Sequence, residues 1–223
     1  MSTEDDEGFQ SLVNIEDIPQ VDRLYDLLGF VEDLTFAAES FDRLAQLSDP
    51  NQEENHWIER QAFFSAAAIA YSRCFGSGVR GKLATSVLDQ LPQDEPGAAR
   101  KVHKFICDMR DKHIAHSVSP FESVMVAGMV QQQTGQHEPL VAVGWMVMQG
   151  LPVGVEAALT CRDIARCLVN YLNGEIKTVQ EQVQEVLKKE DPQDFANRPT
   201  MSYTIPSPEQ AGTPRRFGRG IAP

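Results

Sequence analysis

The order of apolar and polar positions along the 223-residue chain predicts a mainly helical protein. Apolar residues recur at three- and four-residue spacing over residues 19–47, which is typical of a helix with one buried face. The apolar run "FFSAAAIAY" belongs to a second expected helix, over about residues 53–75, which we expect to be central and buried. A short helix is expected over residues 82–91, followed by a fourth that begins near residue 96.

Beyond residue 120 the pattern changes to that of strands. The segments "SVMVAGMV" (123–130) and "LVAVGWMVM" (140–148) are apolar and β-branched, and the polar stretch "QQQTGQHEP" separates them. This pattern predicts a β-hairpin with a long loop over about residues 123–148. A long last helix is expected over residues 155–189. We therefore predict, over residues 19–190, a mainly α fold: an up-and-down helical bundle with a small β-hairpin inserted before the long last helix.

The two ends of the chain differ from this middle part in charge and composition. Residues 1–18 are expected to form an acidic flexible arm, because the first 22 residues hold seven acidic side chains and no Lys or Arg. Residues 191–223 hold six of the thirteen prolines together with several arginines, which predicts a disordered tail. The net charge of −12 argues against broad non-specific binding of nucleic acid. Much of that charge lies in the expected arm, so a local basic patch elsewhere stays compatible with the sequence.

Composition also bears on the cellular compartment and on cofactors. No apolar run is long enough to span a bilayer, and the acidic N-terminus lacks the layout of a secretory signal. We therefore expect a cytoplasmic protein with no membrane association. The four cysteines form no CxxC pair and have no zinc-ligand spacing, so we expect reduced core residues. The sequence predicts no metal site and no cofactor.

The segment "MRDKHIAHS" (109–117), at the end of the fourth expected helix, concentrates ionisable residues. At about 100° per residue, His113 and His116 are expected on the buried face, Arg110 at its edge and Asp111 on the far side. An unpaired buried guanidinium is costly, so Arg110 needs a carboxylate or a water-accessible cleft. Two interpretations stay open. Arg110 pairs with a carboxylate such as Glu59 and the histidines are hydrogen-bonded core residues, or the inward set lines a functional site.

The arrangement of Arg110 and His116, with five residues between them and the polar Asp111 directly after the arginine, resembles the signature of the HEPN superfamily. The string "RDKHIAHS", together with "AYSRCFGSGVRGKL" (70–83) upstream, looks like the abortive-infection-related (AbiU-like) branch of that superfamily. The resemblance covers about residues 20–190 and leaves out both ends. It implies a HEPN-like helical bundle that forms a homodimer, with the motif lining a cleft between subunits.

The resemblance further implies a metal-independent endoribonuclease with RNA as its substrate. Such a protein would act in a toxin or phage-defence setting, with an antitoxin or another protein as a partner. The resemblance implies that His116 would be the acid or base that moves protons. Arg110 would stabilise the charge on the reacting phosphate. Asp111 would orient the site.

Four other residues receive auxiliary roles from the same resemblance. His113 shares the expected buried face and would assist the site. Arg73, Arg80 and Lys82 lie in the upstream segment and would guide the RNA backbone, with structural salt bridges as the equal alternative. The alternative function for the whole chain is a non-catalytic module of the same fold that binds RNA or protein.

Overall fold

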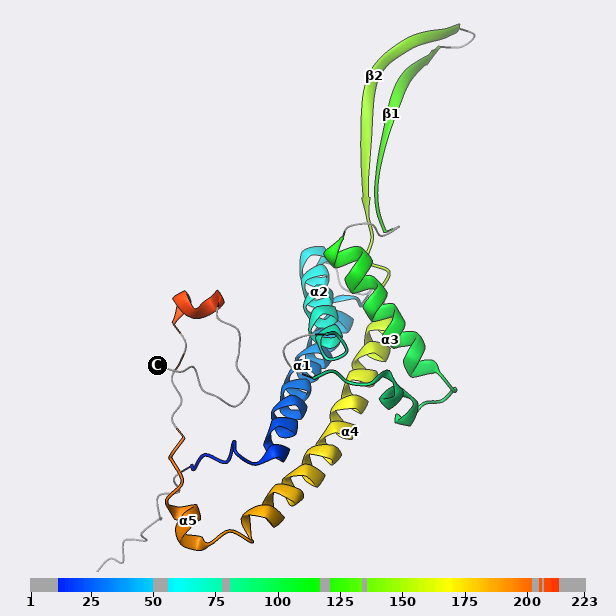
Figure 1. Cartoon of the computed structure of the whole chain (residues 1–223). Helices are drawn as coiled ribbons and strands as arrows, with labels where there is room; N and C mark the ends of the chain where they lie inside the picture. Colours follow the sequence, from blue (N-terminus) through cyan, green and yellow to red (C-terminus); the bar gives the residue numbers. More distant parts are fainter. Residues whose placement is uncertain are drawn as a thin grey trace, which may run out of the picture. The chain divides into compact units, whose positions relative to one another are not determined.

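The computed structural model describes residues 12–49, 56–77, 81–116, 121–133, 136–201, 205 and 207–212 (Figure 1). These residues form a mainly helical protein with a two-stranded antiparallel sheet, as predicted. In chain order the elements are α1 (Pro19–Leu47), α2 (Trp57–Arg73), the 3-10 helix η1 (Thr85–Gln90), α3 (Ala98–Met109), the π-helix η2 (Arg110–Ala115), β1 (Glu122–Gln133), β2 (Gln136–Gln149), α4 (Val155–Leu187), α5 (Pro192–Ala196) and the 3-10 turn η3 (Pro208–Gly212).

The described residues divide into two compact units, whereas we expected one helical domain over residues 19–190. Unit 1 holds the described parts of Met1–Glu32, Ser77–Gly81 and Asn170–Pro223. Unit 2 holds those of Asp33–Gly76 and Lys82–Val169. The long helices α1 (29 residues) and α4 (33 residues) each contribute one part to each unit. A helix of about 20 residues already spans the diameter of a small domain, so helices of this length exceed a single core.

Aromatic side chains from three helices meet in the core of unit 2. Phe41 of α1 and Phe64 of α2 are fully buried, and their ring centroids lie 6.3 Å apart. The ring of Phe64 also lies 6.5 Å from that of Phe105 on α3. Leu168 of α4 is fully buried as well. As predicted, α2 lies at the centre of this core, although its Ile69 is 42% exposed.

An ion pair connects α1 and α4 within unit 2. Nη1 of Arg162 donates to Oδ1 of Asp42 at 2.8 Å, and both side chains are partly buried. The hydrogen bond from Arg162 lowers the pKa of the Asp42 carboxyl, although partial burial opposes the shift. Because the carboxyl has a lower pKa in the folded state, the pair stabilises the fold above the ordinary carboxyl pKa. That stabilisation is lost as the pH falls through the pKa of the folded state.

Replacing Arg162 by glutamine is therefore expected to destabilise unit 2 more at neutral pH than in acid. Well below the ordinary carboxyl pKa of about 3.9, the Asp42 carboxyl of the wild type is itself protonated. The ion pair is then already lost, so the substitution removes less stabilising free energy. Urea unfolding followed by circular dichroism at both pH values measures the difference. Arg166→Gln is the matched control, because the Arg166 guanidinium lies 3.9 Å from Asp42 and is more exposed. An equal loss of stability at both pH values would contradict this account.

Unit 1 has a smaller core, formed by the first turns of α1 and the last turns of α4. Val21 packs with Val183, and Leu24 and Leu187 cover the pair. Next to this core, Arg198 donates to Asp17 (2.5 Å) and to Glu190 (2.9 Å). The hydrogen bond from Arg198 is the main reason that the pKa of the Asp17 carboxyl is lowered.

The described residues that flank unit 1's helices contact one another. Much of the flexible arm expected over residues 1–18 and of the disordered tail expected over residues 191–223 lies outside the described residues. Val13 forms an antiparallel bridge with Thr200, and the guanidinium of Arg198 also donates to the backbone oxygen of Asn14. The helix α5 begins after Asp191, whose carboxylate accepts a hydrogen bond from a backbone N–H of the first turn. These local caps and charge pairs give structure to the described residues before α1 and after α4, although both segments are polar.

The hairpin of unit 2 extends away from the helices as an isolated ribbon (Figure 1). Its register runs from Glu122 opposite Gln149 to Gln133 opposite Gln136, with irregularities on either side of Val130. The hairpin prediction is confirmed, but the long polar loop expected over residues 131–139 is wrong, since most of it belongs to the strands. Ladder hydrogen bonds come from the backbone, so polar side chains do not end a strand.

The remaining predictions concern short elements and the cysteines. The helix expected over residues 82–91 is the six-residue 3-10 helix η1, which buries only Val87 and Leu88. Cys74 and Cys161 are buried and Cys107 and Cys167 are half-buried, and none of the four is in a disulfide. None of the described helices combines the length and the apolar character needed to cross a lipid bilayer.

Candidate functional site

The motif singled out in the sequence lies where α3 changes its helical geometry. The α-helix ends at Met109, and Arg110–Ala115 form the π-helix η2. A π-helix joins residues five apart by hydrogen bonds, so each residue rotates by less than in an α-helix. His116 then leaves the helix with φ −127° and ψ −4°. Short π-helical segments are rare and frequently occur at functional sites.

Arg110, Asp111 and His116 all reach solvent at this turn. Nη1 of Arg110 lies 2.7 Å from Oδ1 of Asp111, and the arginine side chain is 39% exposed. Asp111 is exposed, as predicted, and His116 is exposed too. The expected burial of His116 is therefore wrong, because the projection assumed α-helical rotation up to Ser117.

Arg110 also does not pair with Glu59, which was the alternative drawn from the sequence. The Glu59 carboxylate instead lies 3.7 Å from Nδ1 of His56, one turn earlier on the same helix. The partner of Arg110 is its neighbour in sequence, and such a pair requires no second helix. The guanidinium therefore keeps part of its N–H groups directed to water at the end of α3.

His113, by contrast, lies on the buried face, as predicted, with only 2% of its side chain exposed. The side-chain amide of Gln61 on α2 lies 3.0 Å from its Nε2. When that amide N–H donates, Nε2 accepts and the ring proton is on Nδ1. Nδ1 lies 3.4 Å from Oε1 of Glu122, a distance within ion-pair range but without hydrogen-bond geometry. His113 thus joins α2, η2 and the first residue of β1.

The other charges beside the motif are mostly neutralised locally. Asp108 lies 2.5 Å from Nζ of Lys104 and 3.9 Å from Nζ of Lys112. The hydrogen bond from Lys104 lowers the pKa of the Asp108 carboxyl. Together with the pair formed by Arg110 and Asp111, these contacts give this surface cations and carboxylates in alternation rather than a continuous basic patch.

The auxiliary residues predicted upstream are not joined to the motif by any contact within the described part of the chain. The guanidinium of Arg73 pairs with the carboxylate of Asp33 on α1, as in the salt-bridge alternative. Lys82 is exposed. Arg80 lies outside the described residues. Arg73 therefore has a structural partner of its own in unit 2.

A polar group on α3 that the sequence pattern did not indicate lies about two turns before Arg110. The hydroxyl of Tyr71 on α2 lies 3.2 Å from Nδ1 of His103, and the ring of Phe75 packs edge-on against the same imidazole. Burial raises the pKa of Tyr71 and lowers that of His103. Both shifts favour the neutral forms, so this pair is a packed hydrogen bond between two helices.

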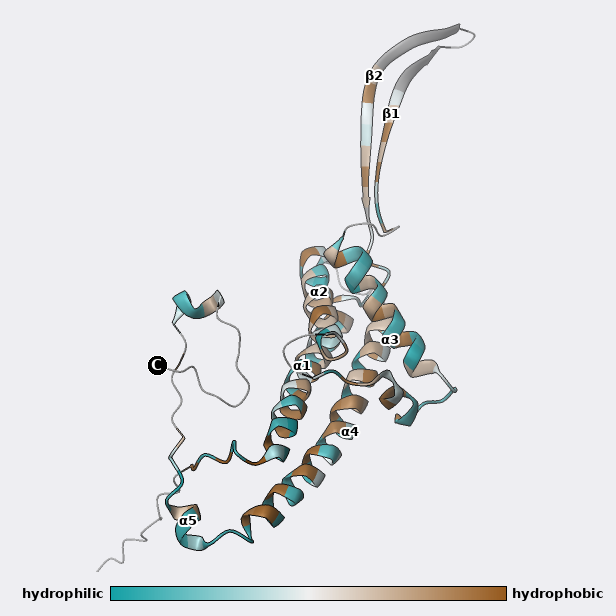
Figure 2. Cartoon of the chain, viewed as in Figure 1, coloured by the Kyte–Doolittle hydropathy of each residue, from teal (hydrophilic) through white to brown (hydrophobic). Residues whose placement is uncertain are grey.

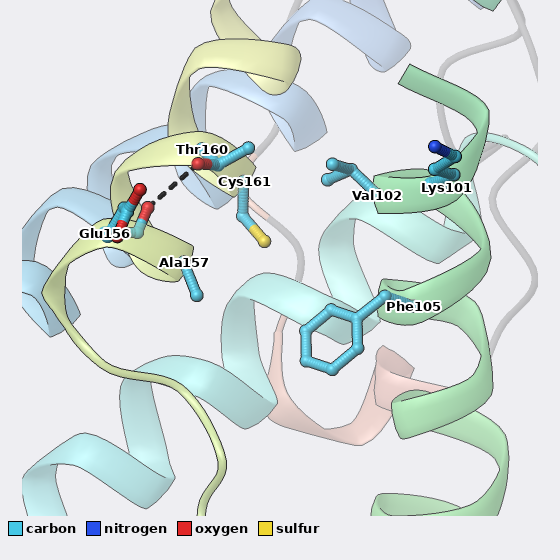
Figure 3. Close-up of a pocket in the computed structure, with 7 residues that line it drawn as sticks. All are labelled: Lys101, Val102, Phe105, Glu156, Ala157, Thr160 and Cys161. Atoms are coloured by element: carbon cyan, nitrogen blue, oxygen red, sulfur yellow. Dashed lines mark hydrogen bonds between the residues drawn. The ribbon is translucent and has the colours of Figure 1, made fainter. Parts of the chain in front are cut away.

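A pocket of about 390 Å³ lies between α3 and the start of α4 (Figure 3). Its lining is mainly apolar and comprises Lys101, Val102, Phe105, Glu156, Ala157, Thr160 and Cys161. Burial raises the pKa of the Cys161 thiol to about 12, so this sulfur is not a nucleophile at neutral pH. The lining includes no residue of the motif. The pocket is thus separate from Arg110 and His116.

Gln61 and Glu122 are the polar partners that sequence reasoning missed. Gln61 comes from α2, 52 residues from His113, and Glu122 is the first residue of β1, outside the helix, so helical spacing alone gives no signal for either. Within the described residues, no three His, Cys, Asp or Glu side chains gather as a metal site requires. Compared with models of known families, with curated proteins and with solved structures, the chain matches none.

Proposed function

We propose that this protein is a metal-independent endoribonuclease of the HEPN type that cleaves RNA with Arg110 and His116. The observation that carries the proposal is the exposure of His116 and the partial exposure of Arg110 at the two ends of η2, with Arg110 paired to Asp111. A phosphodiester can approach either side chain from solvent. The resemblance of "RDKHIAHS" to the superfamily's motif supplies the reaction class.

The chemistry assigned to these groups is an attack of the ribose 2′-oxygen on the adjacent phosphorus. A new bond forms between that oxygen and phosphorus, and the bond from phosphorus to the 5′-oxygen breaks. One proton leaves the 2′-hydroxyl and one reaches the 5′-oxygen, so the products carry a 2′,3′-cyclic phosphate and a 5′-hydroxyl. The imidazole of His116 moves a proton, since a ring nitrogen of imidazole can accept one and give it up again.

Arg110 would stabilise the negative charge that develops on the phosphate oxygens. A guanidinium has five N–H donors in a planar fork, and the pair with Asp111 engages only part of them. Asp111 restricts the arginine side chain before RNA binds, which lowers the cost of orienting it. We further propose that two copies act as a homodimer, in a toxin or phage-defence setting with an antitoxin or other protein partner.

The proposal is tested by incubating the purified full chain with total RNA in the presence of EDTA. We expect cleavage products with 2′,3′-cyclic phosphate ends from the wild type and none from the double variant Arg110→Ala/His116→Ala. Lys112→Ala is the matched control for loss of a cation, because its amine contacts Asp108 and no described contact joins it to Arg110 or His116. It is expected to cleave like the wild type. Cleavage by the double variant, or none by the wild type, refutes the assignment.

A second candidate is a non-catalytic module of the same fold that binds RNA or protein. The observation in its favour is the net charge of −12, together with the carboxylates of Asp108 and Asp111 among the motif's cations. RNA is repelled by such a surface on average. Fluorescence anisotropy of a labelled RNA separates the candidates: the enzyme cleaves it, an RNA-binding module holds it intact, and a protein-binding module neither cleaves nor holds it.

A further inference from the structure

The hairpin exposes apolar side chains that no described residue of the chain covers. The register places Val124 opposite Val147 and Val126 opposite Trp145. Successive residues of a strand point to opposite faces, so these four side chains share one face with Val143. We call these five residues the Trp145 face. They are 56% to 76% exposed, with Trp145 the most exposed of them.

The opposite face of the ribbon is less exposed and chemically different. It carries Met125 opposite Met146, with Met148 next to them. These three methionines are about half exposed. Figure 2 shows the resulting hydrophobic colouring on both strands near the base of the hairpin. The Trp145 face is therefore the larger and stiffer apolar surface, because valines and a tryptophan have few rotamers to lose on contact.

The Trp145 face is a large apolar surface to leave in water. Its five side chains are each more than half exposed and together expose roughly several hundred Å², comparable to the roughly 300–600 Å² of the largest patch on a typical monomer. A standard interface takes about 800 Å² from each partner, so this face would supply the apolar centre of one. An isolated two-stranded hairpin is only marginally stable in water, so covering one face would also stabilise the ribbon itself.

The charge distribution indicates which partner fits this face. Between Glu122 and Glu156 the only charged residue is Glu138, in a chain with a net charge of −12. RNA would require Lys or Arg, and this stretch has neither. A bilayer would leave the outer backbone edges of a two-stranded ribbon without hydrogen-bond partners. Two copies of this acidic chain repel elsewhere, whereas here they can approach without like charges meeting.

We propose that the Trp145 face packs against the Trp145 face of a second copy of this chain. The contact is isologous, so each Trp145 lies on the valines of the other ribbon. The two ribbons form two layers about 10 Å apart, the usual spacing of packed sheets. The proposal concerns the hairpin alone and does not depend on the chemistry of Arg110 and His116.

Sedimentation velocity of the full chain over a range of concentrations tests this dimer. We expect the wild type to dimerise, and Trp145→Glu to raise the dimer Kd by at least about 30-fold, the effect of losing one interface hot spot. Met146→Glu adds the same charge to the same strand on the opposite face, and is expected to change the Kd by less than about threefold, as for a residue outside the contact. Circular dichroism checks that each variant keeps the helical fold.

A second measurement avoids any change to the hairpin. The chain has two tryptophans, so Trp57→Phe leaves Trp145 as its only one. Emission from Trp145 is expected to shift to shorter wavelength as the concentration rises through the dimer Kd. A wild type that stays monomeric, a dimer unaffected by Trp145→Glu, equal loss with Met146→Glu, or constant emission would each overturn the proposal. RNA cleavage is not read in either experiment, so the Trp145 contact and the catalytic assignment of Arg110 and His116 fail separately.

Discussion

Replacing His116 by alanine is expected to lower the rate of RNA cleavage by about 10²–10⁴-fold, the usual contribution of a positioned acid or base. His116 is exposed beyond the end of η2, so its removal leaves the packed core unchanged. The midpoint of thermal unfolding is therefore expected to stay at the wild-type value. Single-turnover cleavage of a labelled RNA in EDTA measures the rate without the contribution of product release.

The matched control for this substitution is His56→Ala. His56 lies at the start of α2 beside Glu59, and no described contact joins it to the motif. Its replacement is expected to leave the rate within about twofold of the wild type, as for a residue that transfers no proton. A His116→Ala rate within tenfold of the wild type would exclude its proposed role.

Replacing Phe64 by alanine is expected to lower the free energy of unfolding by about 3–5 kcal/mol, as for other buried aromatic side chains. Phe64 is fully buried and its ring contacts the rings of Phe41 and Phe105, so three helices lose packing at once. Neighbouring side chains cannot collapse fully into the space. Urea unfolding followed by circular dichroism measures the loss.

The control for this substitution lies on the same helix. Ile69 of α2 is 42% exposed, and Ile69→Ala is expected to cost about 1 kcal/mol, since much of its surface is in water already. Both substitutions put an alanine into the same helix, so the difference between them reports packing. If the two variants unfold at the same urea concentration, the aromatic core does not stabilise unit 2 in the way described.

The parts of the fold that follow from short-range periodicity could be predicted from the sequence. The bounds of α1, residues 19–47, agree with the structure because an apolar stripe and a helix-breaking segment define both ends. The hairpin was placed correctly because its β-branched runs differ from the helical pattern. The division of α1 and α4 between two units could not be predicted, since it depends on contacts between residues far apart in the sequence.

The candidate site shows the same limit at the level of single residues. Counting 100° per residue placed His113 inward and Asp111 outward, and both placements are correct. The count failed for His116 because nothing in the apolar spacing indicated a π-helix after Met109. It also could not find Gln61, because one helix's periodicity carries no information about which neighbour it meets.

The contact between His113 and Glu122 connects the base of the hairpin to the middle of the motif. His113 lies midway between Arg110 and His116 on η2, and Glu122 is the first residue of β1. A displacement of the first residue of β1 therefore acts on the middle residue of η2. A partner bound at the base of the hairpin is thus expected to alter the surroundings of His113 without contacting Arg110 or His116.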